Sequence, residues 1–328
     1  MAVSVTLVVA MRNEEASVEA CLRSIEAQDY DAAPLEVIVV DGESTDRSRE
    51  IAGRIVERHP TWHLVDNPRR IQAVAWNAGI EMASGEVVGI VSGHAELAPD
   101  YVRQAVETLG RTGAAMVGGL VTPLAHGPVP EAIGAAISSP FGVGGARHHY
   151  ATTETETDTV FMALAPRSMY RAFKFDETMV RNQDDELSYR VIDAGYTIIC
   201  NPAIRSRYHV RSSIGALARQ YWAYGFWKVR VLAKHPRRAK PRHVLPALAI
   251  GGFAVLAPLA IRHGPTRSLL ALGVVPYIVV DGALAVRHGL RHGRLSGLAL
   301  AVAFPTMHVS YGAGFAAGMW DALRRRLA

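Results

Sequence analysis

Apolar residues in the first 112 positions alternate between short continuous runs and runs at helical spacing. The continuous runs are rich in Val and Ile, and each ends abruptly in polar residues. Such runs are typical of strands buried on both faces of a parallel sheet, whereas spacings of three and four residues predict amphipathic helices. We expect strands over 3–10, 35–40, 62–65 and 86–91, and helices over 16–28, 45–58, 71–82 and 99–111. The alternation predicts an α/β domain with a mainly parallel, doubly wound sheet.

Beyond position 113 the pattern weakens but continues. Further strands are expected over 116–121, 160–165 and 196–200, and a helix over 184–194. The stretch 123–158 is rich in Gly, Pro, Ser and Thr, so we expect long loops there. Long loops near a binding site often shape the pocket for a second substrate.

The last third of the chain is different, because it contains three long apolar segments, over 244–261, 269–286 and 295–319. Each is close to the length that crosses a bilayer. We favour membrane helices over a buried helical domain, since three such segments follow one another. The sequence is therefore divided into an α/β domain, an amphipathic and basic interfacial region, and a transmembrane region, over 1–215, 216–243 and 244–328.

Basic residues gather just before the apolar segments. The formal net charge is +5 and the pI about 9.3, and seven Lys or Arg residues lie within 228–242. Such patches occur in nucleic-acid-binding proteins and in proteins on anionic membrane surfaces. The apolar segments favour membrane lipids and argue against nucleic acid. Aromatic and basic residues mix over 219–234, which fits an interfacial helix or a packed amphipathic helix equally well.

Charge also bears on orientation. The two cysteines form no disulfide framework, and the N-terminal apolar run is too short for a signal sequence. We therefore expect the α/β domain on the cytoplasmic side of the inner (plasma) membrane. Three full spans would put the arginines at 287–294 inside, as the positive-inside rule requires, but those at 324–326 outside. One segment is therefore expected to be re-entrant or interfacial.

The run at 35–40 ends at Asp41 and Gly42. In open α/β sheets, ligands bind outside the carboxyl ends of the strands. A carboxylate there accepts hydrogen bonds from a base or a ribose, and glycine lets the ligand approach the backbone. The alternative is a simple tight turn. A similar polar strand end, at Arg12, Asn13 and Glu14, favours the binding site.

These strand ends and several later segments closely resemble the inverting family 2 glycosyltransferases, which have the GT-A fold, and in particular their ExoA-like succinoglycan-biosynthesis branch. The resemblance spans roughly 3–230 and is specific only in combination. The matching segments are Met11-Arg12-Asn13-Glu14-Glu15, Val40-Asp41-Gly42-Glu43-Ser44-Thr45-Asp46, Asn67-Pro68-Arg69-Arg70-Ile71-Gln72, Phe175-Asp176-Glu177, Arg181-Asn182-Gln183-Asp184-Asp185-Glu186-Leu187 and Gln220-Tyr221-Trp222-Ala223-Tyr224-Gly225.

The resemblance implies an enzyme, a hexosyltransferase, and gives roles to residues on the donor side. Asp41 would bind the nucleoside of a nucleotide sugar, expected to be a UDP-sugar, with the Arg12-Asn13-Glu14 loop beside it. Arg69 and Arg70 would lie near the diphosphate. Asp184 would be the general base that takes the proton of the acceptor hydroxyl, with Asp185 as the rival candidate.

One segment departs from the family pattern. Where the family has Asp-x-Asp, or Asp-Ala-His in the ExoA-like branch, this chain has Ser92-Gly93-His94. Ser92 supplies no carboxylate, although its hydroxyl could bind a ribose oxygen. His94 would be a metal ligand, with His209 as a second. A divalent cation, Mn²⁺ or Mg²⁺, is thus implied, but the missing carboxylate leaves open whether the arginines stabilise the leaving group instead.

The resemblance also implies an acceptor side. Gln220, Trp222, Trp227 and Lys228 belong to a segment like the Gln-containing helix of the family, just before the apolar segments. The expected acceptor is therefore a lipid-linked (polyprenyl) saccharide. Two alternatives stay open: transfer to a bare polyprenyl phosphate, and a non-catalytic subunit that only binds nucleotide sugars. The discriminating experiment for the second is Asp184→Asn, because a pure binding subunit shows no activity to lose.

Overall fold

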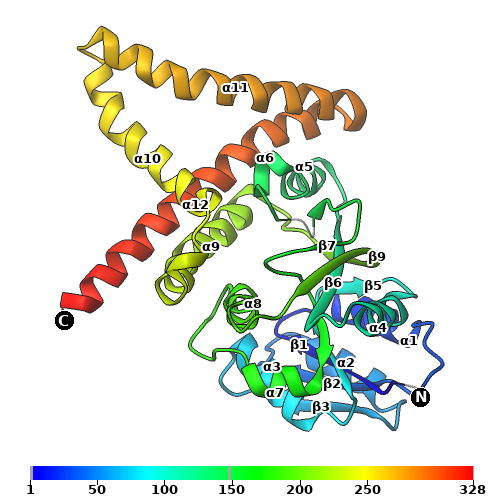
Figure 1. The fold of residues 1–328 in the computed structure, drawn as a ribbon. Helices are drawn as coiled ribbons and strands as arrows, with labels where there is room; N and C mark the ends of the chain where they lie inside the picture. The colour runs from blue at the N-terminus through cyan, green and yellow to red at the C-terminus, as the bar shows by residue number, and fades with distance from the viewer. Residues whose placement is uncertain (1–2, 147–148, 328) are drawn as a thin grey trace. The chain divides into compact units, whose positions relative to one another are not determined.

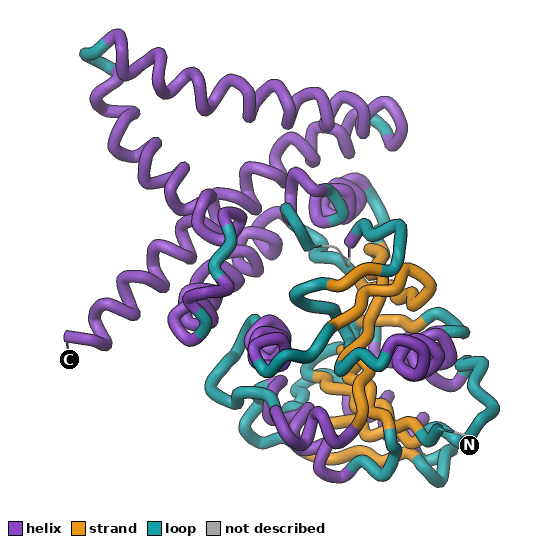
Figure 2. The backbone as a smooth tube through the Cα atoms, viewed as in Figure 1, coloured by secondary structure: helices purple, strands orange, loops and turns teal. Residues whose placement is uncertain are grey.

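The computed structural model describes residues 3–146 and 149–327, which form two compact units. The first unit contains residues up to Leu124 together with Ala146–His209, and the second contains Ala125–Gly145 and the chain from Val210 onward. Among the described residues, strands occur only in the first unit (Figures 1 and 2).

The elements of the first unit alternate as the apolar pattern predicts over the first 112 residues. The strands are β1 (Val5–Met11), β2 (Glu36–Asp41), β3 (Trp62–Asp66), β4 (Val87–Ser92), β5 (Ala95–Leu97), β6 (Met116–Leu124), β7 (Thr155–Glu156), β8 (Leu164–Pro166) and β9 (Ile198–His209). The helices are α1 (Val18–Glu26), α2 (Ser48–Val56), α3 (Gln72–Met82), α4 (Tyr101–Thr112), α7 (Arg167–Phe173) and α8 (Gln183–Asp193).

The described strands form one mixed sheet in the order β3-β2-β1-β4-β8-β6-β9-β5, with β7 paired to β9. The first four are parallel, and the antiparallel pairs β4·β8, β8·β6 and β9·β5 follow. Because β1, β2 and β4 are parallel neighbours, their carboxyl ends meet at one edge. This edge brings together Met11, Asp41 and Ser92, which are at or next to paired positions in the register.

Alternate residues of β1 face two different helix layers. Val5, Leu7, Val9 and Met11 pack in the core with α1, α2 and α4, and Val8 and Ala10 pack in the core with α3, α7 and α8. The first β strand is therefore fully buried, which explains its continuous apolar run. The α3 layer lies very close, since a Cβ added at Gly79 would lie 2.3 Å from Val8 Cγ1.

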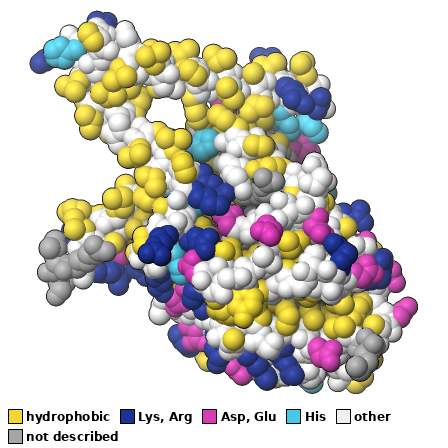
Figure 3. Space-filling model, in the orientation of Figure 1, with side chains coloured by type: hydrophobic (Ala, Val, Ile, Leu, Met, Phe, Trp, Pro, Cys, Tyr) yellow, Lys and Arg dark blue, Asp and Glu magenta, His cyan; other side chains and the backbone are white. Residues whose placement is uncertain are grey.

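The second unit is helical. Its helices are α5 (Pro128–Ile137), α6 (Pro140–Val143), α9 (Ile214–Lys234), η2 (Pro236–Arg238), α10 (Pro241–Ala260), α11 (Gly264–His292) and α12 (Arg294–Leu327). By length and composition α10, α11 and α12 could each cross a membrane. These three long apolar helices suggest membrane association, and Figure 3 shows hydrophobic side chains over much of α10 and α11.

Two local expectations were wrong. The stretch 123–158 is not a set of long loops throughout, because α5 and α6 occupy much of its first half. Pro128 and Pro140 stand at the first helical positions, where their missing amide hydrogen is not needed, so these prolines start helices rather than exclude them. The strand expected over 160–165 begins only at Leu164.

Candidate active site

The loops that follow β1 and β2 hold each other in place. The Asn13 amide donates to Ser44 Oγ at 3.0 Å, and the Thr45 amide donates to Asn13 Oδ1 at 2.8 Å. The Glu14 amide donates to Ser48 Oγ at 2.6 Å. Asn13 has a φ of +56°, which Asn tolerates better than most residues. The polar residues after the two strands therefore act first as a scaffold that fixes the sheet edge.

Asp41 is the buried carboxylate of this scaffold, with a residue exposure of 1%. Ser44 Oγ donates to Asp41 Oδ1 at 2.5 Å, and the Ser44 amide lies 3.3 Å from both carboxylate oxygens. Arg49 Nη1 lies 3.4 Å from Asp41 Oδ2 and also pairs with the exposed Asp66. Beside it the Arg12 side chain lies against Gly42, where an added Cβ would come within 3.2 Å of Arg12 Cβ. The charge of Asp41 is thus held at one fixed position.

A chain of side-chain amides links the end of β4 to the start of α8. Gln72 Nε2 donates to Ser92 Oγ at 3.4 Å, and Gln183 Nε2 donates to Gln72 Oε1 at 2.8 Å. Ser92 and Gln183 are both buried, and Gln183 Oε1 is buried without a hydrogen bond. Asp184, next to Gln183, is half-buried, and its Oδ1 accepts a bond from the Asp185 amide at 3.0 Å. The first turn of α8 is therefore tied to the same sheet edge as Ser92.

Asp184 and Asp185 both lie in the first turn of α8. The amides of a first turn and the helix dipole favour negative charge there. The helix is entered through Asn182, whose φ of +57° turns the chain into the helix. A carboxylate at this position is therefore suited to be ionised at neutral pH, as a general base must be.

His94 and His209 meet where β5 pairs with β9. One residue beyond the paired Ala95 and Tyr208, the His209 amide donates to the His94 carbonyl at 3.3 Å. His94 Nδ1 lies 3.0 Å from Glu14 Oε1. His209 Nε2 is a buried atom with no hydrogen bond, 3.5 Å from Glu96 Oε1. Within 3–146 and 149–327 no three His, Cys, Asp or Glu side chains are gathered tightly enough to hold a metal by themselves.

The two arginines expected near the donor diphosphate are paired with carboxylates. Arg69 bonds to Glu177, and Arg70 Nε donates to Glu43 at 2.6 Å. Both arginine side chains are more than half exposed. The pKa of Glu177 is lowered, chiefly because the Asn77 amide donates to it at 3.0 Å and also because Arg69 lies beside it. Their place near a diphosphate stays a prediction.

The residues expected on the acceptor side lie on α9, in the second unit. Gln220 Nε2 donates to Tyr224 Oη at 2.8 Å, and Arg211 Nε donates to Gln220 Oε1 at 3.2 Å. Trp222 is 44% exposed and stacks on Phe226 with ring centroids 5.3 Å apart. The helix therefore has both hydrogen-bonded side chains, as a packed helix would, and an exposed tryptophan, as an interfacial helix would.

The rest of the acceptor-side set is more enclosed. The Arg230 guanidinium lies 4.3 Å from the ring centroid of Trp227, and Lys228 is buried. A role in binding an acceptor stays a prediction for all four residues.

Sequence reasoning missed the contributions of three residues to the sheet edge, which are Arg49, Gln72 and Gln183. Arg49 is the second residue of α2, and the sequence pattern there is that of an ordinary surface arginine. Gln72 and Gln183 lie within segments that match the family, but nothing in their spacing reveals that they bond to each other across 111 positions. The position of a glutamine at each helix start is the local feature that could have suggested these bonds, because a buried amide there needs a hydrogen-bonding partner.

The comparisons with known proteins agree with this geometry. The profile of Glycosyl transferase family 2 matches residues 6–176. The chain is 30% identical over 329 residues to the succinoglycan biosynthesis protein ExoA of Rhizobium meliloti (strain 1021), covering 98% of this chain and 96% of that protein. It is 27% identical over 239 residues, 70% of this chain and 74% of the relative, to the dolichyl N-acetyl-alpha-D-glucosaminyl phosphate 3-beta-D-2,3-diacetamido-2,3-dideoxy-beta-D-glucuronosyltransferase of Methanococcus voltae.

Among solved structures, the fold is similar to that of the mannosyltransferase PcManGT from Pyrobaculum calidifontis, determined in complex with GDP-Man and Mn²⁺. The TM-score is 0.68 at 23% identity, over 98% of this chain and 88% of that one. This similarity shows the fold, a GT-A-like mixed sheet followed by long apolar helices. The family match covers the strands and loops that build the sheet edge around Asp41 and Ser92. The chain is therefore a glycosyltransferase that belongs to glycosyl transferase family 2.

Proposed function

We propose that this protein is a membrane-attached inverting glycosyltransferase that moves a sugar from a nucleotide sugar to a lipid-linked (polyprenyl) saccharide, in the synthesis of a cell-surface polysaccharide or glycolipid. Two relatives support the acceptor class, because one is named for succinoglycan biosynthesis and the other for a dolichyl-linked sugar phosphate. The apolar helices support a substrate that resides in the membrane. The basic segment before them supports a cytoplasmic α/β unit at the inner membrane.

One observation carries the catalytic part of the proposal. The bridge from Ser92 through Gln72 to Gln183 ties the start of α8 to the sheet edge that holds Asp41. The helix start that is tied to this edge carries the half-buried Asp184, and the edge itself carries the buried Asp41. This division suits a binding role for Asp41 and a proton-transfer role for Asp184.

The proposed reaction is a single displacement. The acceptor hydroxyl gives its proton to the Asp184 carboxylate, and its oxygen forms a bond to the anomeric carbon of the donor sugar. The bond between that carbon and the diphosphate oxygen breaks on the opposite face, so the configuration inverts and a nucleoside diphosphate leaves. Asp41 accepts hydrogen bonds from the nucleoside and keeps the donor in line.

The kinds of donor atom near His94 suit a divalent cation of the Mn²⁺ type, but within the described residues no three of these side chains lie close enough together to hold it, so oxygens of the donor diphosphate would have to complete its ligands. His94 and His209 offer imidazole nitrogens, and Glu14 and Glu96 offer carboxylate oxygens close to them. The buried His209 Nε2 has no hydrogen bond and is available to a ligand. A mixed nitrogen and oxygen set suits Mn²⁺ better than Mg²⁺. When bound, the cation would neutralise charge on the departing diphosphate.

The test is a transfer assay on membranes that contain the protein, with UDP- and GDP-sugars, with and without Mn²⁺. We expect transfer from a nucleotide sugar, with a UDP-sugar as the first candidate, to a polyprenyl-diphosphate-linked sugar, and stimulation by Mn²⁺. Transfer only to a short water-soluble sugar would contradict the acceptor class. Transfer only to bare polyprenyl phosphate would favour the alternative activity. Donor binding without transfer or hydrolysis of any sugar would favour the binding subunit.

A further inference from the structure

The three apolar helices of the second unit are not equivalent. In the most apolar window of α10 and of α11, 11% of the residues are buried, whereas in α12 the share is 39%. A helix that is apolar and exposed all round suits a lipid environment, whereas a helix that is buried along one face is packed on protein. The helix α12 is therefore packed on protein to a greater extent than α10 and α11.

The exposed face of α12 is an apolar stripe along most of the helix. It repeats every seventh residue, which keeps it on nearly one side of the helix over about 42 Å. This is longer than the roughly 30 Å hydrocarbon core of a bilayer. A long helix that packs on protein along one side and exposes apolar residues along the other can lie in the plane of a membrane surface, with the exposed side against the lipid. The seventh-residue positions of the stripe are Leu295, Val302, Val309, Ala316 and Leu323, and the exposed Leu298 and Trp320 lie on the same side.

The second half of α12 packs on α9 at very short range. A Cβ added at Gly314 would lie 2.0 Å from the Trp222 carbonyl oxygen, so only glycine permits this approach. Farther along, Arg230 Nη2 lies 3.1 Å from Asp321 Oδ2. The two helices thus lie side by side over about two turns or more.

The helix α9 does not suit the hydrocarbon core. It carries Arg219, Lys228, Arg230 and Lys234, spread over about 22 Å of helix, and it is not among the candidate spans. Charged side chains inside the core are costly. Because the second half of α12 is packed against α9, it should lie at the same depth as α9, outside the hydrocarbon core of the bilayer.

The helices α10 and α11 form a hairpin whose two open ends both rest on α12. Pro246 of α10 lies against Gly312, and Ala285 and Gly289 of α11 lie against Gly297. The two glycines are 15 residues apart, about 22 Å along α12. The helix α12 therefore crosses the open side of the hairpin, as the triangle of α10, α11 and α12 in Figure 1 shows.

We infer that only α10 and α11 cross the membrane, and that α12 lies with α9 along the membrane surface at the base of this hairpin, with its apolar stripe against the lipid. The inference depends on the membrane attachment proposed above but not on the transfer reaction. It also removes the conflict of three spans with the positive-inside rule, because the basic residues before α10, at the end of α11 and at the end of α12 then all lie on one side of the membrane.

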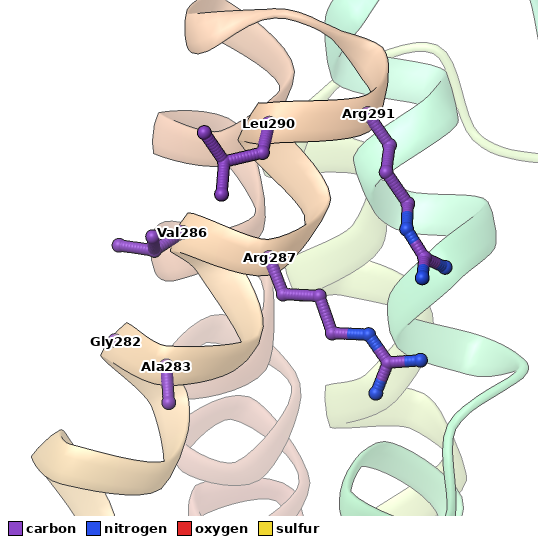
Figure 4. A pocket seen from close by; sticks show the side chains of 6 residues that line it. All are labelled: Gly282, Ala283, Val286, Arg287, Leu290 and Arg291. Carbon is purple, nitrogen blue, oxygen red and sulfur yellow. The ribbon is translucent and has the colours of Figure 1, made fainter.

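The end of α11 fits an interface on that side. Figure 4 shows Arg287 and Arg291 extending from one side of the helix and Val286 and Leu290 from the other. Such a split places cations at the headgroups while apolar side chains face the acyl chains. The opposite end of the hairpin carries fewer basic residues, with Arg262 and Arg267 near the turn.

The test is labelling of single introduced thiols with a membrane-impermeant maleimide in sealed inside-out vesicles. The substitutions are Ala239→Cys before α10, His263→Cys at the hairpin turn and Arg325→Cys near the end of α12, all at exposed positions. The native thiols give little background, because Cys21 and Cys200 are buried and burial raises the pKa of Cys21 to about 12.

We expect Ala239→Cys and Arg325→Cys to be labelled in intact vesicles, because both then lie on the outer face. His263→Cys should be labelled only after detergent opens the vesicles. Labelling of Arg325→Cys together with His263→Cys, from the side opposite to Ala239→Cys, would show three spans and overturn the inference. Labelling of all three from one side would overturn it as well, because the hairpin would then not cross. Recovery of each variant in the membrane fraction is the control for folding.

Discussion

Replacement of Asp41 by Asn tests the donor side of the site. The side chain keeps its size, and Ser44 can still donate to the remaining carbonyl oxygen, so the scaffold of the sheet edge should survive. What is lost is the negative charge, which sits at 1% residue exposure at the end of β2. A nucleoside that donates to this carboxylate in the wild type would meet a neutral amide in the variant.

The size of the effect follows from the kind of bond removed. A hydrogen bond to a charged group contributes about 1.5–3 kcal/mol, which corresponds to roughly 10- to 150-fold weaker binding. Isothermal titration calorimetry of the detergent-solubilised protein with UDP and with GDP, in the presence of Mn²⁺, measures this change in Kd. Thermal unfolding of the same samples checks that the variant is folded.

Asp66→Asn is the matched control. Asp66 shares Arg49 with Asp41, but its side chain is 66% exposed and lies at the end of the neighbouring strand. Its replacement should change the Kd little, because exposed ion pairs contribute little. Unchanged nucleotide binding by Asp41→Asn, or equal weakening by both variants, would refute the assignment of Asp41 to the nucleoside.

Two further predictions concern stability. The pKa of Glu177 is lowered, first by the Asn77 amide, so the stabilising contribution of its carboxylate is complete above the ordinary pKa of 4.5 and is lost as the pH falls through the lowered value. The difference in unfolding free energy between wild type and Glu177→Gln should therefore become smaller in acid. A difference that grows in acid would contradict this. Gly79→Ala should lower the unfolding free energy by about 1–3 kcal/mol, because the new Cβ would lie 2.3 Å from Val8 Cγ1. The control is Gly110→Ala in α4, which should not lower it, because no atom lies within 4 Å of that Cβ. Equal midpoints of the two variants in thermal melts would refute the close approach at Gly79.

The buried strands and the sheet edge could be predicted because their physical cause is local. β1 and β4 are buried over their whole length, and their sequences are apolar except for Thr6, Gly89 and Ser92. Polar residues that follow parallel neighbouring strands must meet at one edge, whatever the rest of the fold. For this reason Asp41 and Ser92 could be assigned to one edge before the structure was known.

Other features depend on contacts between distant segments. The composition of residues 128–137, rich in small residues and Pro, predicts a loop, yet Ala132, Ile133, Ala136 and Ile137 are on the buried face of α5. The helix forms because α12 covers that face, which no local pattern reveals. The bond between Gln72 and Gln183 is likewise a product of the fold, and together with the core packing of Leu187 and Val191 it holds α8 at the sheet edge.

The most direct test of the proposed chemistry compares Asp184→Asn with Asp185→Asn in a transfer assay, with donor binding measured on the same samples. A general base typically contributes 10²–10⁴-fold to the rate, so the account predicts that Asp184→Asn lowers kcat by roughly this factor while the Kd for the nucleotide stays near the wild-type value, and that Asp185→Asn retains most of the activity. Retained activity in Asp184→Asn, or a larger loss in Asp185→Asn, would contradict it.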